Sequence, residues 1–230
     1  MLPIRALATD VDGTLTNRSY GISCAALEAL RRLEKEGISV ILASGNAYPV
    51  LRALRGYVGG SGAIVCENGA VVEYKDEVKL LGDKREAEAA LKALKEACGK
   101  KVVESWQNPF RLVDVALRRT VDREQIEDAL KAFPNMKLID SGFAYHILRK
   151  DIDKAVGLRV ACDMMDLKMS ELAAVGDSET DREMLLAVAL KAAVGDAPES
   201  LRRIADYVAS KANGEGVAEL ADYLLREARR

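Results

Sequence analysis

Two acidic residues and a glycine follow an apolar run near the start of the chain. In the stretch LATDVDGTLT, residues 7–16, Asp10 and Asp12 flank a valine, and Gly13 and Thr14 come next. A turn needs only one of those acids and the glycine, so a structural role does not account for both carboxylates. Gly13 permits a tight turn, and we expect the Thr14 hydroxyl to hold the loop by a hydrogen bond to the backbone. The pattern indicates a chemical function at this strand end.

Three more apolar runs end in polar residues. They are followed by Ser44-Gly45-Asn46, by Glu67-Asn68-Gly69, and by Gly176-Asp177-Ser178 with Asp181 four residues after Asp177. In open parallel sheets, ligands bind at the carboxyl ends of the strands. We therefore expect these polar residues to converge on one site.

The types of residue in this set suggest a ligand. Several acids in one crevice repel each other, and a hard divalent cation is the usual way to hold them. Mg²⁺ suits a site with a few carboxylates, bound water and a phosphate oxygen. Ser44 at a strand end and Lys154 at the expected start of a helix are suited to bind phosphate oxygens. The set predicts a site for a phosphate group and Mg²⁺.

The elements that position these residues follow the order of βαβ units. Apolar runs at 4–10, 38–44 and 62–69 alternate with helical patterns at 24–37 and 50–59. This order is typical of an α/β fold with a doubly wound, mostly parallel sheet. For the first helix, Ser23 is suited to be the N-cap and Gly37 to end it.

The order of elements changes in the middle of the chain. Residues 70–81 have the pattern of a hairpin. A helical pattern that begins at Asp83 is followed by two strand-like runs, at 100–106 and 110–119. A second helical pattern begins at Asp122 and is followed by two more strand-like runs, at 136–140 and 143–150. We expect an α-β-β-α-β-β cap domain of residues 83–150. It is inserted into a core of residues 1–82 and 151–230 and joined to it by short hinges.

The motifs taken together point to a family. DVDGT after an apolar strand resembles the first motif of the haloacid dehalogenase-like superfamily. The remaining motifs of that superfamily follow in order: Ser44-Gly45, Lys154 after the insert, and GDSETD at 176–181. The position and element order of the insert resemble the second type of cap, and its modest size is similar to that of the archaeal phosphoglycolate phosphatases of the Cof-like branch. The resemblance covers essentially the whole chain.

This resemblance implies a mechanism. Asp10 would be the nucleophile that forms an aspartyl-phosphate, and Asp12 would protonate the leaving oxygen and then activate water. Ser44, Gly45 and Lys154 would hold the transferring phosphoryl group. The metal ligands implied are Asp10, the main-chain carbonyl of Asp12, and Asp177, with Asp181 either a ligand through water or an anchor for the others.

Several further residues are candidates for the wall of the site. Asn46 stands where the wider superfamily commonly has Arg, so the sequence does not predict which group it contacts. For Asn68 a role in a turn is favoured over a role in the wall of the site. His146, the only histidine, lies in a strand-like run of the insert, where packing is favoured over contact with substrate. Arg111 and Trp106 are expected to be exposed loop residues rather than the mouth of the cap. With one histidine and no GxSxG motif, the sequence argues against a Ser-His-Asp hydrolase.

The resemblance, rather than any single residue, favours 2-phosphoglycolate as the substrate, hydrolysed to glycolate and phosphate. Within the superfamily, a sugar-phosphate phosphatase or a phosphomutase is the alternative. A phospho-accepting receiver-like switch, which does not turn over, is an alternative of another class, and the large insert argues against it.

Composition limits the partners. The chain has 230 residues, of which 49% are hydrophobic, with 34 Lys and Arg against 36 Asp and Glu. This balance gives no overall field for nucleic acid or an anionic membrane. Four scattered cysteines and the absence of a run of about 20 apolar residues favour a reduced, cytoplasmic, soluble protein. We expect a monomer or homodimer that binds a small phosphorylated metabolite.

Overall fold

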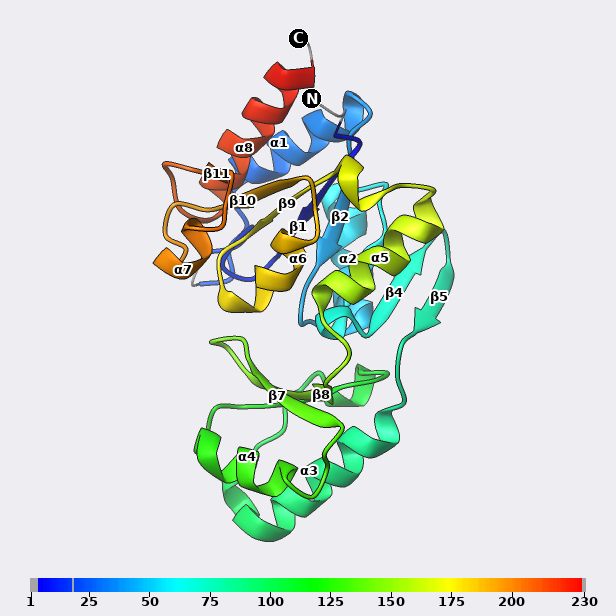
Figure 1. The fold of residues 1–230 in the computed structure, drawn as a ribbon, viewed down its shortest axis with the longest axis vertical. Helices are drawn as coiled ribbons and strands as arrows, with labels where there is room; N and C mark the ends of the chain where they lie inside the picture. Colours follow the sequence, from blue (N-terminus) through cyan, green and yellow to red (C-terminus); the bar gives the residue numbers. More distant parts are fainter. Residues whose placement is uncertain (1–3, 18, 229–230) are drawn as a thin grey trace.

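The structure is a computed structural model that describes residues 4–17 and 19–228. Within these ranges the chain forms one lobe on a large sheet and one on a small sheet (Figure 1). Among the described residues, the large sheet has eight strands in the order β11-β10-β9-β1-β2-β3-β4-β5. Their bounds are β1 Ala6–Thr9, β2 Ser39–Ala43, β3 Ile64–Cys66, β4 Val71–Tyr74, β5 Glu77–Leu80, β9 Leu172–Gly176, β10 Leu190–Ala193 and β11 Tyr207–Val208.

The large sheet is mostly parallel. β1 pairs in parallel with β2 and β9, and the parallel pairing continues to β3 on one side and to β10 and β11 on the other. The hairpin β4–β5 adds an antiparallel edge. All four residues of β1 and all five of β9 are buried, as expected for short apolar strands that helices cover on both faces. The predicted α/β fold is confirmed.

Helices connect and cover these strands. Their bounds are α1 Cys24–Lys35, α2 Tyr48–Val58, α5 Lys154–Met165, α6 Arg182–Leu186, α7 Glu199–Arg202 and α8 Asn213–Ala228. α1 packs against α8, while α5 packs against α6, β3 and β4. The predicted cap of α1 is present, because the Ser23 side chain accepts a hydrogen bond from the Ala26 N–H at 3.4 Å. No helix in the described ranges has the length and hydropathy that crossing a membrane requires.

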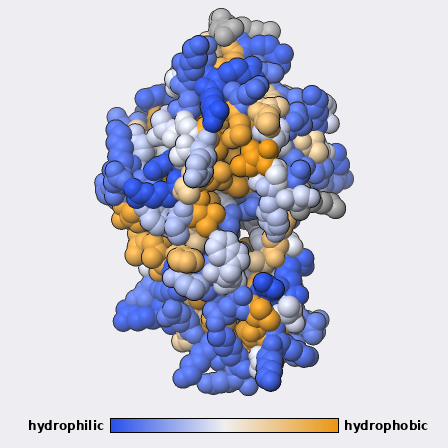
Figure 2. Space-filling model, turned by 180° about the vertical axis from the view of Figure 1, so that it is seen from behind, coloured by the Kyte–Doolittle hydropathy of each residue, from blue (hydrophilic) through white to orange (hydrophobic). Residues whose placement is uncertain are grey.

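The second lobe comes from the middle of the chain. It contains α3 (Lys84–Cys98), α4 (Arg123–Leu130) and an antiparallel sheet in the order β6-β8-β7, formed by Val115–Leu117, Tyr145–Arg149 and Met136–Asp140. It has its own buried apolar cluster, which includes Leu94, Ile126 and Ile147. On the face that Figure 2 shows, the surface of this lobe is mainly hydrophilic.

One strand of the expected α-β-β-α-β-β order is wrong. Residues 100–106 do not form a strand, and their pairing is limited to a single bridge between Glu104 and Leu117. The chain turns after Ser105, whose carbonyl accepts the Asn108 N–H. The Asn108 side-chain oxygen then accepts the Ala116 N–H at 2.8 Å, which a longer ladder would have used. The turn therefore ends the pairing.

Candidate active site

Three acids meet at the carboxyl edge of the large sheet. Asp10 follows β1 and Asp177 follows β9, and because these strands are parallel neighbours, paired at Thr9 and Val175, both acids leave the sheet at the same edge. Asp181 lies in the short 3-10 turn after Asp177. One carboxylate oxygen from each of Asp10, Asp177 and Asp181 lies within 4.8 Å of the others. The structure thus brings together three of the predicted metal ligands.

Lys154 contacts two of these acids. Its ammonium group donates to Asp10 Oδ1 at 2.6 Å and to Asp181 Oδ1 at 2.7 Å, and all three side chains are buried. Burial opposes the charged form of Lys154, but the two carboxylates outweigh it and hold the pKa above its ordinary value. Three carboxylates and one ammonium group leave two negative charges in the cluster.

Burial and this excess charge together raise the pKa values of Asp10 and Asp177. Burial, together with the charges of Asp181 and Asp177, raises the pKa of Asp10 well above its ordinary value despite Lys154. Burial and the charge of Asp181 raise the pKa of Asp177 to about 6. A cluster of oxygen donors with two uncompensated negative charges fits a hard divalent cation. The residues present therefore suit a bound metal ion.

The loop after β1 is held against Asp177. Gly13 has φ +93°, and a Cβ added there would overlap Asp177 Oδ2, so this position requires glycine. The Thr14 hydroxyl donates to Asp177 Oδ1 at 2.8 Å. The predicted bond from Thr14 to the backbone is thus wrong: the chain turn at Gly13 points the hydroxyl at the carboxylate instead. Asn213, which sequence reasoning missed, donates to the Gly13 carbonyl at 2.7 Å from the start of α8.

Asp181 is fixed by its own loop. Its Oδ2 accepts hydrogen bonds from the N–H groups of Asp177 and Ser178 at 3.2 and 3.1 Å, while its Oδ1 accepts from Lys154. Both oxygens thus have protein partners. This arrangement favours the role of an anchor for Asp181 over that of a metal ligand through water.

Asp12, Ser44 and Asn46 form a second group beside the acids. Asn46 Nδ2 donates to Asp12 Oδ2 at 2.5 Å and to Ser44 Oγ at 3.0 Å. Ser44 follows β2 and is buried, and its hydroxyl lies 3.5 Å from Asp12 Oδ2. Burial raises the pKa of Asp12, while its hydrogen bond from Asn46 opposes the rise. The contact of Asn46 that the sequence left open is thus with Asp12.

The start of α5 places Lys154. Asp153 is the N-cap and accepts the Val156 N–H at 2.9 Å. Gly69, with φ +102°, lies so close that a Cβ there would overlap the Asp153 carbonyl oxygen. The turn at 67–69 therefore packs directly against the first turn of α5, and this close approach aims Lys154 at Asp10.

The second lobe contributes a buried polar cluster to the same site. Asp114 accepts a hydrogen bond from Arg111 at 2.5 Å and lies 2.9 Å from His146 Nδ1, and Arg111 also donates to the Gly45 carbonyl at 3.0 Å. Asn68 Nδ2 lies 3.4 Å from Asp114 Oδ2. Arg111 is only 4% exposed, so the prediction of an exposed loop arginine is wrong. Its ion pair with Asp114 and its hydrogen bond to the Gly45 carbonyl, 66 residues away in the sequence, explain the burial. Trp106 is exposed, as predicted, but it also lines the cavity between the lobes, which the prediction had disfavoured.

Glu67, one of the polar residues at the strand ends, joins the two lobes, a role that the sequence did not predict. Its buried carboxylate accepts the N–H groups of Leu112, Val113 and Asp114 at 2.9 to 3.1 Å. Burial and the nearby charge of Asp114 raise its pKa to about 7, although the backbone hydrogen bonds oppose this. No motif marks this residue, because its partners are backbone groups.

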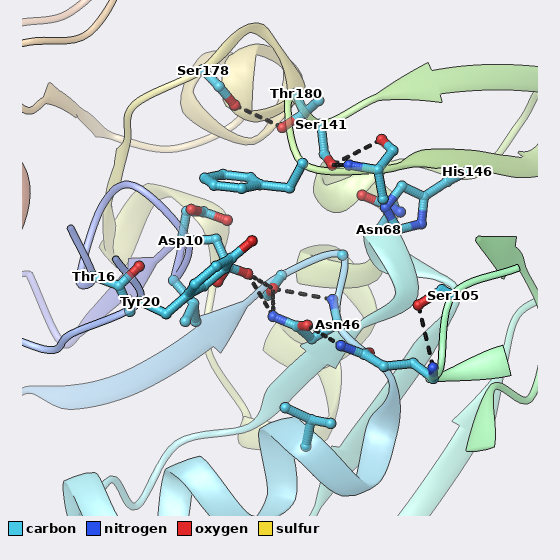
Figure 3. Close-up of a pocket in the computed structure, with 18 of the residues that line it drawn as sticks. Asp10, Thr16, Tyr20, Asn46, Asn68, Ser105, Ser141, His146, Ser178 and Thr180 are labelled. Atoms are coloured by element: carbon cyan, nitrogen blue, oxygen red, sulfur yellow. Dashed lines mark hydrogen bonds between the residues drawn. The ribbon is translucent and has the colours of Figure 1, made fainter. Parts of the chain in front are cut away.

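A cavity of about 600 Å³ lies between the lobes. Its walls include Asp10, Asp12 and Lys154 from the first lobe and Arg111 and His146 from the second. Figure 3 shows His146 beside Asn68 on one wall and Asp10 and Tyr20 on another. Tyr20 contacts Phe143 of the second lobe across the cavity, with ring centroids 5.6 Å apart.

Comparison with known proteins agrees with this geometry. A model of the haloacid dehalogenase-like hydrolase family matches residues 7–107 and 104–220. The chain is a haloacid dehalogenase-like hydrolase. It is 38% identical to a phosphoglycolate phosphatase of Methanothermobacter thermautotrophicus over 216 residues, which cover 94% of this chain and 96% of that protein. It is 39% identical to a phosphoglycolate phosphatase of Archaeoglobus fulgidus over 228 residues, covering 97% and 98% of the two chains.

Solved structures have the same fold as this chain. A crystal structure from Thermoplasma acidophilum matches with a TM-score of 0.88 at 27% identity and covers 97% of this chain and 99% of that one. A haloacid dehalogenase-like hydrolase from Bacteroides thetaiotaomicron matches with a TM-score of 0.81 at 21% identity, covering 96% and 99%. The second match supports the fold alone.

Proposed function

We propose that this hydrolase is a Mg²⁺-dependent phosphomonoesterase that acts through an aspartyl-phosphate on Asp10, with 2-phosphoglycolate as its substrate. The observation that carries the proposal is the cluster of Asp10, Asp177 and Asp181, in which Lys154 pairs with Asp10 and Asp181. Asp10 and Lys154 line a cavity to which both lobes contribute. The choice of substrate is supported by the archaeal relatives named phosphoglycolate phosphatase.

Asp10 is the nucleophile in this proposal. Lys154 binds Asp10 Oδ1 at 2.6 Å, which favours the charged form of the carboxylate against the effect of burial and leaves Oδ2 to attack phosphorus. The attack forms the Oδ2–P bond and breaks the bond from phosphorus to the leaving oxygen. Mg²⁺, held by Asp10, Asp177 and the main-chain carbonyl of Asp12, would neutralise the charge that builds up on the phosphoryl oxygens.

Asp12 supplies and removes the proton. Burial raises its pKa, which favours the protonated form that can donate to the leaving oxygen. Once ionised, the same carboxylate accepts a proton from the water that hydrolyses the aspartyl-phosphate. Ser44, Gly45 and Lys154 bind the oxygens of the phosphoryl group during both steps.

The other end of the substrate lies against the second lobe. We place its carboxylate beside His146 and Asn68, which share Asp114 as a hydrogen-bond partner on the wall of the cavity. Burial lowers the pKa of His146, so the imidazole is neutral before substrate binds. An anionic ligand beside it favours uptake of a proton, and the doubly protonated ring donates to both Asp114 and the ligand.

Residues 83–150 act as a cap in this proposal, and residues 1–82 and 151–230 as the core. The links run from the end of β5 at Leu80 to α3 and from the end of β8 at Arg149 to α5. Closure of the cap excludes water during the first transfer and completes the wall around the substrate. A cytoplasmic location and a monomeric or homodimeric state stay predictions.

The test is phosphate release from phosphoglycolate, ethyl phosphate and a set of sugar phosphates, with Mg²⁺ and with a chelator. We expect metal-dependent turnover with the highest kcat/KM on phosphoglycolate. Ethyl phosphate lacks the carboxylate, so the ratio of kcat/KM for phosphoglycolate to that for ethyl phosphate measures the contribution of the wall beside His146. Asp10→Asn should abolish turnover, whereas Asp163→Asn on the exposed face of α5 should not change it.

Other outcomes would select the alternatives. Faster turnover of a sugar phosphate would keep the site and replace the substrate. Conversion of one sugar phosphate into another without net phosphate release would identify a phosphomutase. Phosphorylation without any multiple turnover would indicate a receiver-like switch.

A further inference from the structure

One chain of hydrogen bonds connects the second lobe to the predicted acid–base residue. Gln107 lies in the turn after Ser105, and its side-chain amide reaches across to the first lobe. Its Oε1 accepts the Ala47 N–H at 2.7 Å, and its Nε2 donates to Asn46 Oδ1 at 2.7 Å. Asn46 Nδ2 donates in turn to Asp12 Oδ2 at 2.5 Å.

The chemistry of the end groups fixes the direction of this chain. A backbone N–H can only donate, so the Gln107 atom that faces Ala47 is the amide oxygen. The Gln107 amide nitrogen then faces Asn46, which must present its oxygen. Asn46 is left with its own nitrogen toward Asp12, where an ionised carboxylate can only accept. Every donor in this chain of hydrogen bonds faces an acceptor, and neither side-chain amide can be flipped without breaking that pairing.

Gln107 itself is held from the second lobe. Arg111 Nη2 lies 3.4 Å from Gln107 Oε1 and 3.0 Å from the Gly45 carbonyl. The contacts of Gln107 with Asn46 and Ala47 therefore form or break together when the two lobes approach or separate. Separation would leave Asn46 with only Ser44 and Asp12 to orient its amide.

We propose that Gln107 and Asn46 are positioning residues, which hold the Asp12 carboxyl in its working orientation only while the second lobe is closed over the first. The inference rests on the proposed function, since it concerns the step that Asp12 carries out there. Its consequence is that proton transfer to the leaving group depends on closure. An open enzyme that reached the phosphoryl group would lack a correctly oriented acid.

The leaving group of the substrate shows whether Gln107 positions Asp12 or only packs between the lobes. Glycolate and ethanol are poor leaving groups that need a proton, whereas p-nitrophenolate leaves without one. The ratio kcat/KM reports the steps up to the first irreversible transfer, so it detects the acid only for the poor leaving groups. A loss of packing between the lobes would lower both values alike.

The experiment compares Gln107→Ala and Gln107→Glu with the unmodified protein on ethyl phosphate and p-nitrophenyl phosphate. Gln107→Glu keeps the shape but cannot donate to Asn46 when ionised. For both variants we expect kcat/KM for ethyl phosphate to fall about tenfold, which is the effect expected from the loss of one hydrogen bond to a charged group. The value for p-nitrophenyl phosphate should fall less than about threefold, because its leaving group needs no proton. Ethyl phosphate is used because it tests the acid without the wall beside His146.

Two controls complete the design. Gln125→Ala removes an exposed glutamine of α4 in the same lobe and should leave both substrates unaffected. Asn46→Ala should give the same preferential loss as Gln107→Ala, and the double variant should be no worse than Asn46→Ala alone, because the two residues act in series. Equal losses for both substrates, no loss at all, or additive effects in the double variant would overturn the inference but not the proposed function. No turnover by the unmodified protein would overturn the proposed function and the inference with it.

Discussion

At the scale of single residues, the site depends on charge balance around Lys154. Its ammonium group is the cation that contacts both Asp10 and Asp181, and all three are buried. A buried charge that loses its partner is costly, because neither water nor a counter-ion replaces it. Lys154 therefore affects both the stability of the fold and the charge of the nucleophile.

We expect Lys154→Met to fold but to lose at least about a hundredfold in kcat, because the transferring phosphoryl group loses a cation and Asp10 its partner. Its free energy of unfolding should fall by about 3 kcal/mol. Steady-state kinetics and urea unfolding measure the two effects. Lys92→Met, on the exposed face of α3, is the control and should change neither; a Lys154→Met variant with normal kcat would contradict the assigned role.

Residue types could be predicted at this scale better than residue contacts. Asp10, Asp12, Lys154 and Asp177 follow from motifs that are local in sequence. The partner of Thr14 and the burial of Arg111 could not be predicted, because Thr14 contacts Asp177 and Arg111 contacts the Gly45 carbonyl, groups that only the fold brings close. Glu67 and Asn213 contact backbone groups, which carry no sequence signature.

At the scale of elements, Glu67 connects the turn after β3 to the segment before β6. Its pKa is raised to about 7, above the ordinary value near 4.3 for glutamate in an unfolded chain. Between these values the folded protein binds more protons at this site than the unfolded protein does. Glu67 therefore makes stability decrease as pH rises from about 4.5 to about 7, with no further change above that range.

We expect Glu67→Gln to remove this dependence. Urea unfolding of both proteins at pH 5 and at pH 8 gives the difference in unfolding free energy at each pH. The stability of the unmodified protein relative to the variant should be lower at pH 8 than at pH 5, by up to about 3 kcal/mol. A difference that is constant with pH, or that changes in the opposite direction, would show that the carboxyl group does not titrate in this way. Glu124→Gln, at an exposed position of α4, is the matched control.

The order of elements could largely be predicted from the sequence. Apolar runs and capping residues located the strands of the large sheet and the start of α1 at Ser23. Residues 100–106 were misassigned because their apolar content is typical of a strand, while the turn that ends the pairing depends on a side-chain contact of Asn108. At this segment the contact of Asn108, rather than the apolar pattern of the sequence, determines the local structure.

At the scale of the whole molecule, the two lobes meet around one cavity. Besides Glu67 and Gln107, the aromatic pair of Tyr20 and Phe143 closes the opposite side. Both rings are partly exposed, at 62% and 41%, so their contact is made at the surface of the cavity. The sequence predicted an insert but not how it meets the core, since such contacts depend on the relative placement of distant segments.

We expect Phe143→Ala to weaken closure. Loss of one aromatic pair costs about 0.5–1.5 kcal/mol beyond its buried area, so KM for phosphoglycolate should rise roughly two- to tenfold while kcat changes little. Tyr57→Ala removes an aromatic side chain that is 79% exposed on α2 and should leave KM unchanged. An unchanged KM for Phe143→Ala would mean that the pair does not contribute to closure.

The central claim is that Asp10 carries the phosphoryl group during turnover. The most direct measurement is rapid acid quenching of the protein with phosphoglycolate and Mg²⁺, followed by mass spectrometry of its peptides. We expect a phosphoryl group on the peptide that contains Asp10, formed and lost within one turnover and absent from Asp10→Asn. Steady turnover with no phosphorylated peptide, or with the group on another residue, would contradict it.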